Sequence, residues 1–205
     1  KLIVTPASAI GTSRTPLEPD DYRRMADVLR RRGIRYVLFT GGNGSMDTCG
    51  KLRDACRGMD VFVAGIPKTI DNDIAVIDHA PGYSSAANFV VRCVSEIAQD
   101  VRAMPIHVCI VETMGRNAGW LAAAAGLART RHGAAADLIY LPERPFDEER
   151  FLTDVERLHS GKGGLVIVVS EGLKKADGST VAPPMFRQGR ARYDGEAGSY
   201  LARQI

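Results

Sequence analysis

The sequence predicts an α/β protein in which a mostly parallel sheet carries helices on both faces. Short apolar runs alternate with longer amphipathic stretches along the chain, an order typical of parallel strands joined by crossover helices. Glycine or proline stands at several of the boundaries, for example at Gly33, Gly41 and Pro81. Polar residues follow several of the apolar runs, and we expect them at one edge of the sheet, where open α/β sheets bind ligands.

Composition and charge narrow the class of protein. The chain has 205 residues, 45% hydrophobic and 25% charged, with a net charge of +3, as in an ordinary soluble globular protein. This mild charge predicts no nucleic-acid partner, and no apolar run approaches the length of a membrane span. The four cysteines include no Cys-x-x-Cys pair, so we expect reduced thiols in a cytoplasmic protein.

The first half of the chain predicts three strands and two helices. A short strand at residues 1–5 leads into a polar loop at 9–16 that a proline closes. Pro19, Asp20 and Asp21 open a helix, because acidic residues favour the positive end of the helix dipole, and Gly33 ends it. Further apolar runs predict strands at 36–39 and 61–64, with a helix at 46–56 between them.

The second half continues the alternation. Helices are predicted at 86–102, near Trp120 and at 147–159, and strands at 107–111, 137–141 and 165–169. Residues 174–184 are predicted as a loop with a tight turn at Asp177-Gly178. The last segment, 189–205, predicts a helix from about Gly198.

Residues 65–73 bring several reactive groups into one loop after the strand at 61–64. Pro67 biases its predecessor away from the helical region and is expected to stop the strand. An amine, a hydroxyl and two carboxylates then follow within six residues, on Lys68, Thr69, Asp71 and Asp73. A solvated turn is the alternative, because Asp and Asn favour turns for local reasons. The position at a strand end favours a ligand site.

Two other segments suit a phosphate. The turn Gly-Gly-Asn-Gly-Ser at 41–45 joins a strand to a helix, so backbone N–H groups can approach an anion closely. Glycine there also simply permits a tight turn. The polar loop at 9–16 holds Arg14, either as part of an ordinary turn or as a phosphate contact.

Two later strand ends also carry charge. Arg116 precedes the helix near Trp120, where a cation is unfavourable unless an anion joins it. That asymmetry favours a functional arginine over an ordinary surface charge. Ser170, Glu171 and Gly172 form a polar end to the strand at 165–169.

Together these motifs resemble the phosphofructokinase family. They are Gly-Thr-Ser-Arg at 11–14, Gly-Gly-Asn-Gly-Ser at 41–45, Pro-Lys-Thr-Ile-Asp-Asn-Asp at 67–73, Met-Gly-Arg at 114–116 and Ser-Glu-Gly at 170–172. The resemblance extends to about Gly172, and the pairing of the third and fourth motifs is highly specific. It implies a phosphofructokinase-like, three-layer α/β/α fold. It also implies transfer of a phosphoryl group from ATP or pyrophosphate to the 1-hydroxyl of fructose 6-phosphate.

The resemblance further implies a role for each matching residue. The catalytic residues would be Asp71 as general base, Arg116 as the cation facing the transferred group, and Thr69. The substrate would contact Thr69, Ile70, Asp71, Met114, Gly115, Arg116 and Glu171. The donor would contact Arg14, Gly41, Gly42, Asn43, Gly44, Ser45 and Lys68, and Mg²⁺ would bind Asn43 and Asp73. Beside Lys68, Asp71 is expected to stay ionised at neutral pH, as a general base must.

The resemblance also divides the chain. It implies a donor-phosphate part at 1–105 and a sugar-phosphate part at 106–205, within a homo-oligomer of two or four subunits. The resemblance also implies that N- and C-terminal parts of the family fold lie outside these residues. We therefore expect the 205-residue chain alone to have an incomplete and inactive site.

Four positions bear on metal, donor and subunit contacts. Asn43 replaces the Asp of most members, which leaves Mg²⁺ more dependent on donor phosphates. His107 stands where short bacterial members place an arginine that reaches a neighbouring subunit, so that contact is not expected here. Gly44 leaves open a space that Asp fills in pyrophosphate users, whereas Lys68 is typical of pyrophosphate users. We expect ATP, because a charged block bears on nucleotide entry more directly than an extra cation.

Three alternatives remain. One is a pyrophosphate-dependent phosphotransferase, and another is a non-catalytic copy of the fold that binds sugar phosphate or nucleotide. The presence of Asp71, Thr69 and Arg116 together argues against a non-catalytic copy. A kinase of the diacylglycerol or NAD type shares a Gly-Gly-Asp-Gly motif but lacks the motif at 67–73.

Overall fold

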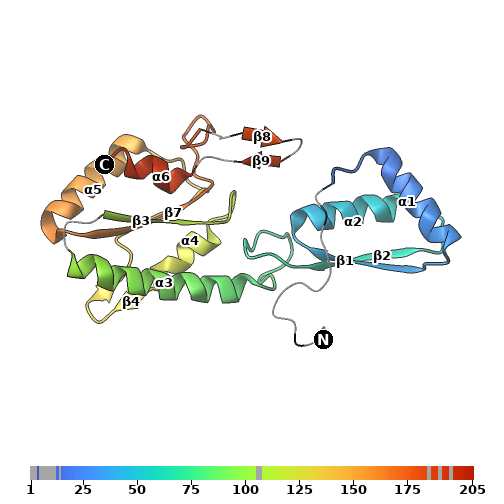
Figure 1. Ribbon diagram of the computed structural model, residues 1–205, viewed down its shortest axis with the longest axis horizontal. Coiled ribbons are helices and arrows are strands. Elements are labelled where there is room, and N and C mark those ends of the chain that lie inside the picture. The colour runs from blue at the N-terminus through green and yellow to red at the C-terminus, as the bar shows by residue number, and fades with distance from the viewer. Residues whose placement is uncertain are drawn as a thin grey trace.

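Two parallel sheets organise the computed structural model of the chain (Figure 1). The structure describes Val4, Ser13 and residues 15–104, 108–183, 186–188, 191–193 and 196–205. The predicted strand at 1–5 therefore lies outside the described residues except for Val4, and Arg14 and His107 lie outside them too.

The larger sheet has the strand order β3 (Val108–Thr113), β7 (Leu165–Ser170), β6 (Leu138–Tyr140), and both of its pairings are parallel. Helices α3 (Tyr83–Ala103) and α4 (Trp120–Ala124) lie on one face. Helices α5 (Glu148–Lys162) and α6 (Ala197–Ala202) lie on the other (Figure 1). This is the predicted three-layer α/β/α arrangement.

The central strand β7 shows why helices cover both faces. Every residue of β7 is buried, and successive side chains of a strand point to opposite faces. Val166 and Val168 join a cluster with residues of α3 and α4, whereas Leu165, Ile167 and Val169 join a second cluster with residues of α5 and α6. An unbroken apolar run is the pattern expected of a strand in the middle of a parallel sheet.

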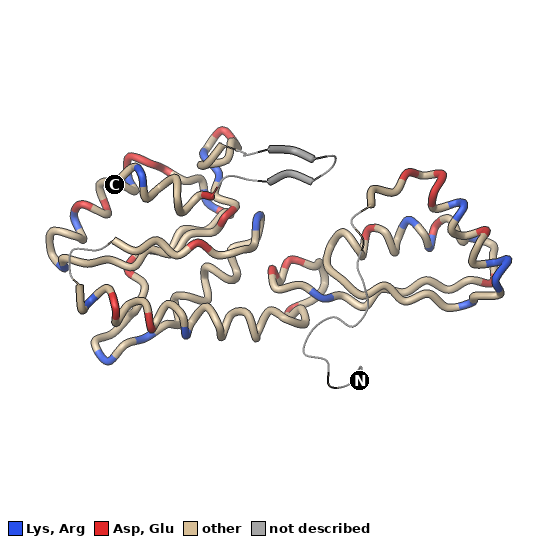
Figure 2. The backbone as a smooth tube through the Cα atoms, in the orientation of Figure 1, with Lys and Arg blue, Asp and Glu red and all other residues tan. Residues whose placement is uncertain are grey.

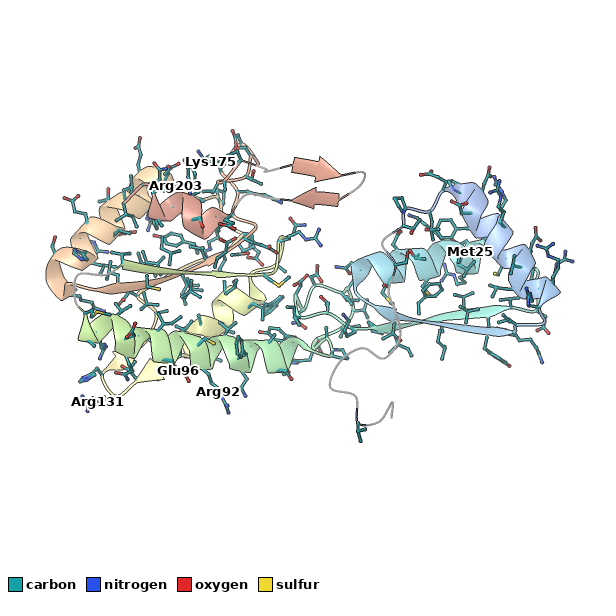
Figure 3. The ribbon with its side chains drawn as sticks, in the orientation of Figure 1. Met25, Arg92, Glu96, Arg131, Lys175 and Arg203 are labelled. Carbon is teal, nitrogen blue, oxygen red and sulfur yellow. The ribbon has the colours of Figure 1, made fainter. Side chains whose placement is uncertain are left out.

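The smaller sheet pairs β1 (Tyr36–Gly41) with β2 (Phe62–Pro67) in parallel. Helices α1 (Pro19–Arg31) and α2 (Asn43–Ala55) pack on one face and form a hydrophobic cluster with it. Met25 of α1 packs against this cluster (Figure 3). The other face carries Tyr36, which is 70% exposed and stacks on Phe62. Sequence alternation did not predict that the parallel strands would divide into two sheets.

Charge follows the expected pattern on the outer helices. Helix α1 has acidic residues in its first turn and basic residues in its last (Figure 2), as the helix dipole favours. Arg92 and Glu96 lie on the side of α3 that faces away from the sheet (Figure 3). No helix among the described residues is long and apolar enough to cross a membrane.

Several element boundaries differ from the predictions or were not predicted. Strand β2 continues through Pro67, because it pairs with β1 alone and a proline at the end of an edge strand removes no ladder hydrogen bond. Helix α2 begins at Asn43, since Gly42 in extended conformation is already its N-cap. Helix α4 has only five residues and passes into the 3-10 helix η2 (Ala125–Leu127).

Two small hairpins were not predicted. One pairs β4 (Arg129–Thr130) with β5 (Gly133–Ala134), and the other pairs β8 (Phe186–Gln188) with β9 (Ala191–Tyr193). Their strands have two or three residues, too few for an alternating pattern to be visible in a sequence.

Candidate functional site

The turn after β1 and the turn after β2 pack directly on each other. The backbone N–H of Lys68 donates to the carbonyl of Gly41 at 2.8 Å. A Cβ on Gly42 would lie 3.4 Å from the carbonyl oxygen of Lys68, and one on Gly41 would lie 2.2 Å from Oγ of Ser45. Glycine at 41 therefore leaves room for the side chain of Ser45 within the turn, and position 42 lies in van der Waals range of the loop that begins at Lys68.

Asn43 and Asp73, the two predicted metal ligands, are in contact. The amide Nδ2 of Asn43 donates to Oδ2 of Asp73 at 2.6 Å, which ties the first turn of α2 to the loop after β2. This bond uses the NH2 group of the Asn43 amide and does not involve its oxygen, which is the atom that could bind a metal ion. Within the described residues, no group of three or more His, Cys, Asp or Glu side chains could hold a metal ion.

Asn72 shapes the loop between the two carboxylates, a role that the sequence did not reveal. It is buried and adopts a φ of +56°, a region that Asn tolerates better than most residues. Its Nδ2 donates to the carbonyl of Asp78 at 3.1 Å, and its Oδ1 accepts from the N–H of Ala80 at 2.8 Å. The nitrogen and the oxygen of the Asn72 amide therefore both tie the loop that carries Asp71 and Asp73 to residues 78–80.

Asp71 is half-buried and lies among charged groups from three strand ends. Burial raises its pKa above the ordinary value, the charge of Asp73 raises it further, and Arg116 opposes the rise. Glu171 also raises this pKa, and a hydrogen bond from Thr69 lowers it. The sequence pointed to Lys68 as the neighbouring cation, and Arg116 is a cation among the main causes of this pKa shift.

Arg116 lies in a loop that the end of β7 holds in place. Oε1 of Glu171 accepts hydrogen bonds from the backbone N–H groups of Gly115 and Arg116, at 3.1 Å each. Glu171 was predicted as a ligand of sugar hydroxyls, and its contact with this loop was missed. No local signal could reveal it, because the partners stand 55 and 56 residues apart.

The start of α4 shows two more contacts that the sequence did not predict. Oε1 of Glu143 accepts from the N–H of Gly119 at 2.7 Å, which satisfies one of the free donors at a helix start. The ring of Trp120 makes an edge contact with Tyr83 at 6.3 Å between centroids. The hydroxyl of Tyr83 donates to the carbonyl of Trp120 at 3.4 Å.

The remaining predicted residues are exposed or beside this centre. Lys68, Gly44 and Met114 are exposed, and a Cβ on Gly44 would meet no atom within 4 Å. Ile70 lies 3.5 Å from the position of a Cβ on Gly82. Arg14 lies outside the described residues.

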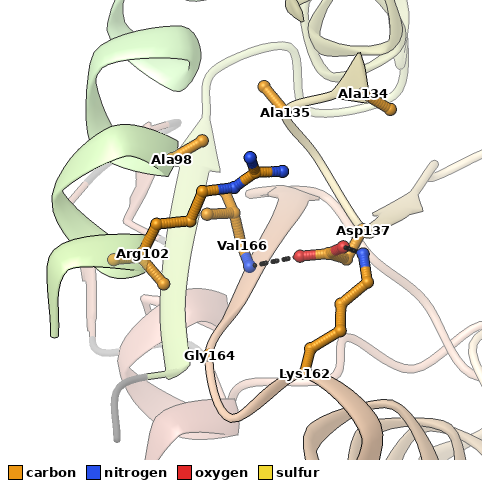
Figure 4. Close-up of a pocket in the computed structure, with 9 residues that line it drawn as sticks. Ala98, Arg102, Ala134, Ala135, Asp137, Lys162, Gly164 and Val166 are labelled. Carbon is orange, nitrogen blue, oxygen red and sulfur yellow. Dashed lines mark hydrogen bonds and ion pairs between the residues drawn. The ribbon is translucent and has the colours of Figure 1, made fainter. Parts of the chain in front are cut away.

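Two cavities in the described part of the chain lie away from these residues. One, of about 240 Å³, lies between the C-terminal end of α3 and the start of β7 (Figure 4). Its lining includes Arg102 and Lys162, and Lys162 is bonded to Asp137, which also accepts from the N–H of Val166 at 2.9 Å. The other, of about 410 Å³, lies between α1 and β1. The predicted site residues therefore line neither cavity.

Comparison with known proteins gives a consistent family. The family profile described as Phosphofructokinase matches residues 1–205. A pyrophosphate–fructose 6-phosphate 1-phosphotransferase from Xanthomonas campestris is 43% identical over 100% of this chain and 52% of that protein. An ATP-dependent 6-phosphofructokinase from Amycolatopsis methanolica is 37% identical over 80% of this chain and 35% of that protein.

A solved structure agrees with these relatives. The pyrophosphate-dependent phosphofructokinase from Marinobacter aquaeolei has 37% identity and a TM-score of 0.73, covering 85% of this chain and 45% of that chain. This chain thus spans about half the length of the relatives that it matches.

Proposed function

The chain belongs to the phosphofructokinase family, and from that premise we propose that the protein containing it transfers a phosphoryl group from pyrophosphate to the 1-hydroxyl of fructose 6-phosphate. One observation carries this proposal. Asp71, Arg116 and Glu171 come from the ends of three different strands, and the charges of Arg116 and Glu171 both act on Asp71. A base and a cation at such a position suit a hydroxyl nucleophile and a transferred phosphoryl group.

In the proposed reaction, Asp71 accepts the proton of the sugar hydroxyl as that oxygen attacks the terminal phosphorus of the donor. Arg116 offsets the charge on the transferred group, and the other phosphate leaves with the bridging oxygen. Positioning and electrostatic stabilisation supply most of the catalysis in phosphoryl transfer. Thr69 would hold Asp71, since its hydroxyl accepts from the N–H of Asp71 at 3.1 Å.

The donor is expected to lie along residues 41–45 and Lys68. Backbone N–H groups at the start of α2 and the exposed ammonium of Lys68 both favour an anion. Asn43 and Asp73 would hold Mg²⁺ through an amide oxygen and a carboxylate, with donor phosphates completing the shell, as Mg²⁺ commonly binds. The ion would neutralise charge on those phosphates.

Similarity to known proteins supports pyrophosphate over ATP, which the sequence had favoured. The relative from Xanthomonas campestris named for pyrophosphate is more similar than the ATP-dependent relative from Amycolatopsis methanolica. The open space at Gly44 permits a nucleotide but does not require one, because the smaller donor also fits an unobstructed turn. The cation of Lys68 attracts either donor.

A donor comparison on the full-length protein tests this proposal. Purified enzyme would be assayed with fructose 6-phosphate and Mg²⁺, with pyrophosphate or ATP as the only phosphoryl donor. We expect turnover with pyrophosphate and a much lower kcat/KM with ATP. Faster turnover with ATP would favour the ATP-dependent activity. Sugar phosphate binding without turnover on either donor would favour a non-catalytic copy of the fold.

A further inference from the structure

The loop between β3 and α4 holds Arg116 in a backbone conformation that needs outside support. Its φ is +36°, close to the left-handed region that residues with a Cβ rarely occupy. Such a conformation persists only where the surrounding structure enforces it. The residues that enforce it therefore help to decide where the guanidinium of Arg116 lies.

Glu171 supplies the first restraint. Both of its loop contacts use a single oxygen, Oε1, and join consecutive peptide N–H groups, those of Gly115 and Arg116. Hydrogen bonds to an ionised carboxylate are stronger than bonds between neutral groups. They hold two peptide units of the loop against the end of β7.

Gly172 supplies the second restraint through its backbone. A Cβ on Gly172 would lie 1.4 Å from the carbonyl oxygen of Arg116 and 2.7 Å from its Cα. These are backbone atoms, which cannot rotate aside as the end of a long side chain can. Any other amino acid at position 172 must therefore displace Arg116 or its own segment.

Lys174 supplies the third restraint, and the sheet fixes all three. Nζ of Lys174 donates to Oδ1 of Asn117 at 2.8 Å. Upstream, Thr113 and Ser170 are partners in the β3–β7 ladder, and the N–H of Glu171 donates to the carbonyl of Thr113 at 2.9 Å. All three restraints therefore come from the segment that directly follows β7 in its parallel pair with β3.

We propose that residues 171–174, the clasp, hold Arg116 in the direction of Asp71, and that Gly172 is a positioning residue for phosphoryl transfer. The proposal rests on the proposed function, in which Arg116 stabilises charge on the transferred group. Beyond that function, the clasp explains why Arg116 is held where it is. A displacement of about 1 Å at a catalytic group can lower the rate by about 100-fold.

The first test is Gly172→Ala in the full-length enzyme. We expect kcat to fall by about 100-fold, because the arginine would act on the charge of the transition state. Gly161→Ala is the matched control, since a Cβ there meets no atom within 4 Å; its kcat should equal that of the wild type. A kcat of Gly172→Ala close to the wild-type value would overturn the proposal.

A double-mutant cycle separates positioning from general damage. In an Arg116→Ala background, Gly172→Ala should cause no further loss of kcat, because its effect passes through the arginine. Losses that multiply would overturn the proposal. If Gly172→Ala does not fold, Lys174→Met replaces it in the same cycle. That variant removes the ammonium and its bond to Asn117, and a smaller loss of kcat is expected, again absent in the Arg116→Ala background.

Hydrogen exchange tests the clasp without relying on turnover. The amides of Gly115 and Arg116 should exchange faster in Glu171→Ala than in the wild type. In Glu171→Gln they should remain slow, because the side-chain amide oxygen still accepts both bonds. Equal exchange in Glu171→Ala and the wild type would overturn the clasp. An inactive wild-type enzyme would instead refute the proposed function, and the exchange result would still decide the clasp.

Discussion

Asp71 combines partial burial with two neighbouring carboxylates and one arginine. Its folded pKa is raised above the ordinary 3.8, with burial as the largest cause. A raised carboxyl pKa means that folding favours the protonated form. The stability gained from this carboxyl is therefore present below pH 3.8 and is lost as the pH rises through the folded pKa.

Asp71→Asn in the full-length enzyme should consequently separate activity from stability. Loss of the base should lower kcat by about 10²–10⁴-fold, while Tm at pH 7 should stay equal or rise, because an unfavourable charge is removed. Steady-state rates and calorimetry measure both effects. Asp177→Asn is the control with the opposite sign. Hydrogen bonds from Ser179 lower the pKa of Asp177, so its loss should lower Tm and leave kcat unchanged.

The side-chain amide of Asn43 donates to the carboxylate of Asp73. A carboxylate at position 43 would instead repel that of Asp73. In Asn43→Asp, loss of the 2.6 Å bond should destabilise the protein by about 1 kcal/mol, or about 2–4 °C in Tm. Added Mg²⁺ should restore Tm, because it would bridge the two carboxylates. Asn43→Ala also loses the bond but forms no carboxylate pair, so its Tm should not respond to Mg²⁺ beyond the wild type. An equal Mg²⁺ response in both variants would contradict this prediction.

At the scale of elements, glycine position decides where α5 ends. Gly163 lies just after the helix with a φ of +75°, and its N–H donates to the carbonyl of His159 at 2.8 Å. Gly161 is the second-last residue of the same helix and has open space around it. Gly161 therefore has a helical backbone, whereas Gly163, two residues later, has a left-handed one.

Alanine at these positions should have effects of opposite sign on Tm. Gly163→Ala should destabilise the protein by about 1 kcal/mol, because alanine pays for a left-handed backbone. Gly161→Ala should stabilise it by about 0.5–1 kcal/mol, because alanine loses less backbone entropy in a helix. Thermal unfolding of both variants measures the two changes in Tm. Changes of the same sign would contradict the position of the helix end.

Element boundaries were predictable where local chemistry sets them. Gly33 and the acidic first turn fixed α1, and the apolar run at 165–169 located β7 to within one residue. The prediction that Pro67 stops its strand was wrong, because the cost of a proline in a strand depends on whether another strand pairs there. The contact between Glu171 and the Arg116 loop was hidden because it joins elements far apart in the chain.

For the whole molecule, alternation of elements predicted three layers, but not which strands pair. The three hydrophobic clusters formed by the described residues follow the division into two sheets. Two cover opposite faces of the β3–β7–β6 sheet, and the third, which includes Leu52, belongs to the β1–β2 sheet. Strand pairing depends on tertiary contacts, which a single sequence does not display.

Substitutions in separate clusters should add. Leu52→Ala should cost about 2–5 kcal/mol and Ile167→Val about 0.5–1.5 kcal/mol, and the double variant should match their sum within about 0.5 kcal/mol. Val155→Ala with Ile167→Val lies within one cluster and should deviate by more than this. Denaturant titrations supply the free energies of unfolding. Strong coupling between Leu52 and Ile167 would mean that the two sheets share one core.

Trp120 is the sole tryptophan of the chain, and it stands four residues after Arg116 with its ring against Tyr83. Its indole emission therefore originates from a single place, next to the loop that bears the arginine. Quenching or a spectral shift on adding a sugar phosphate would report local rearrangement in real time, with no dye or label. The fold thus carries its own optical probe for stopped-flow work.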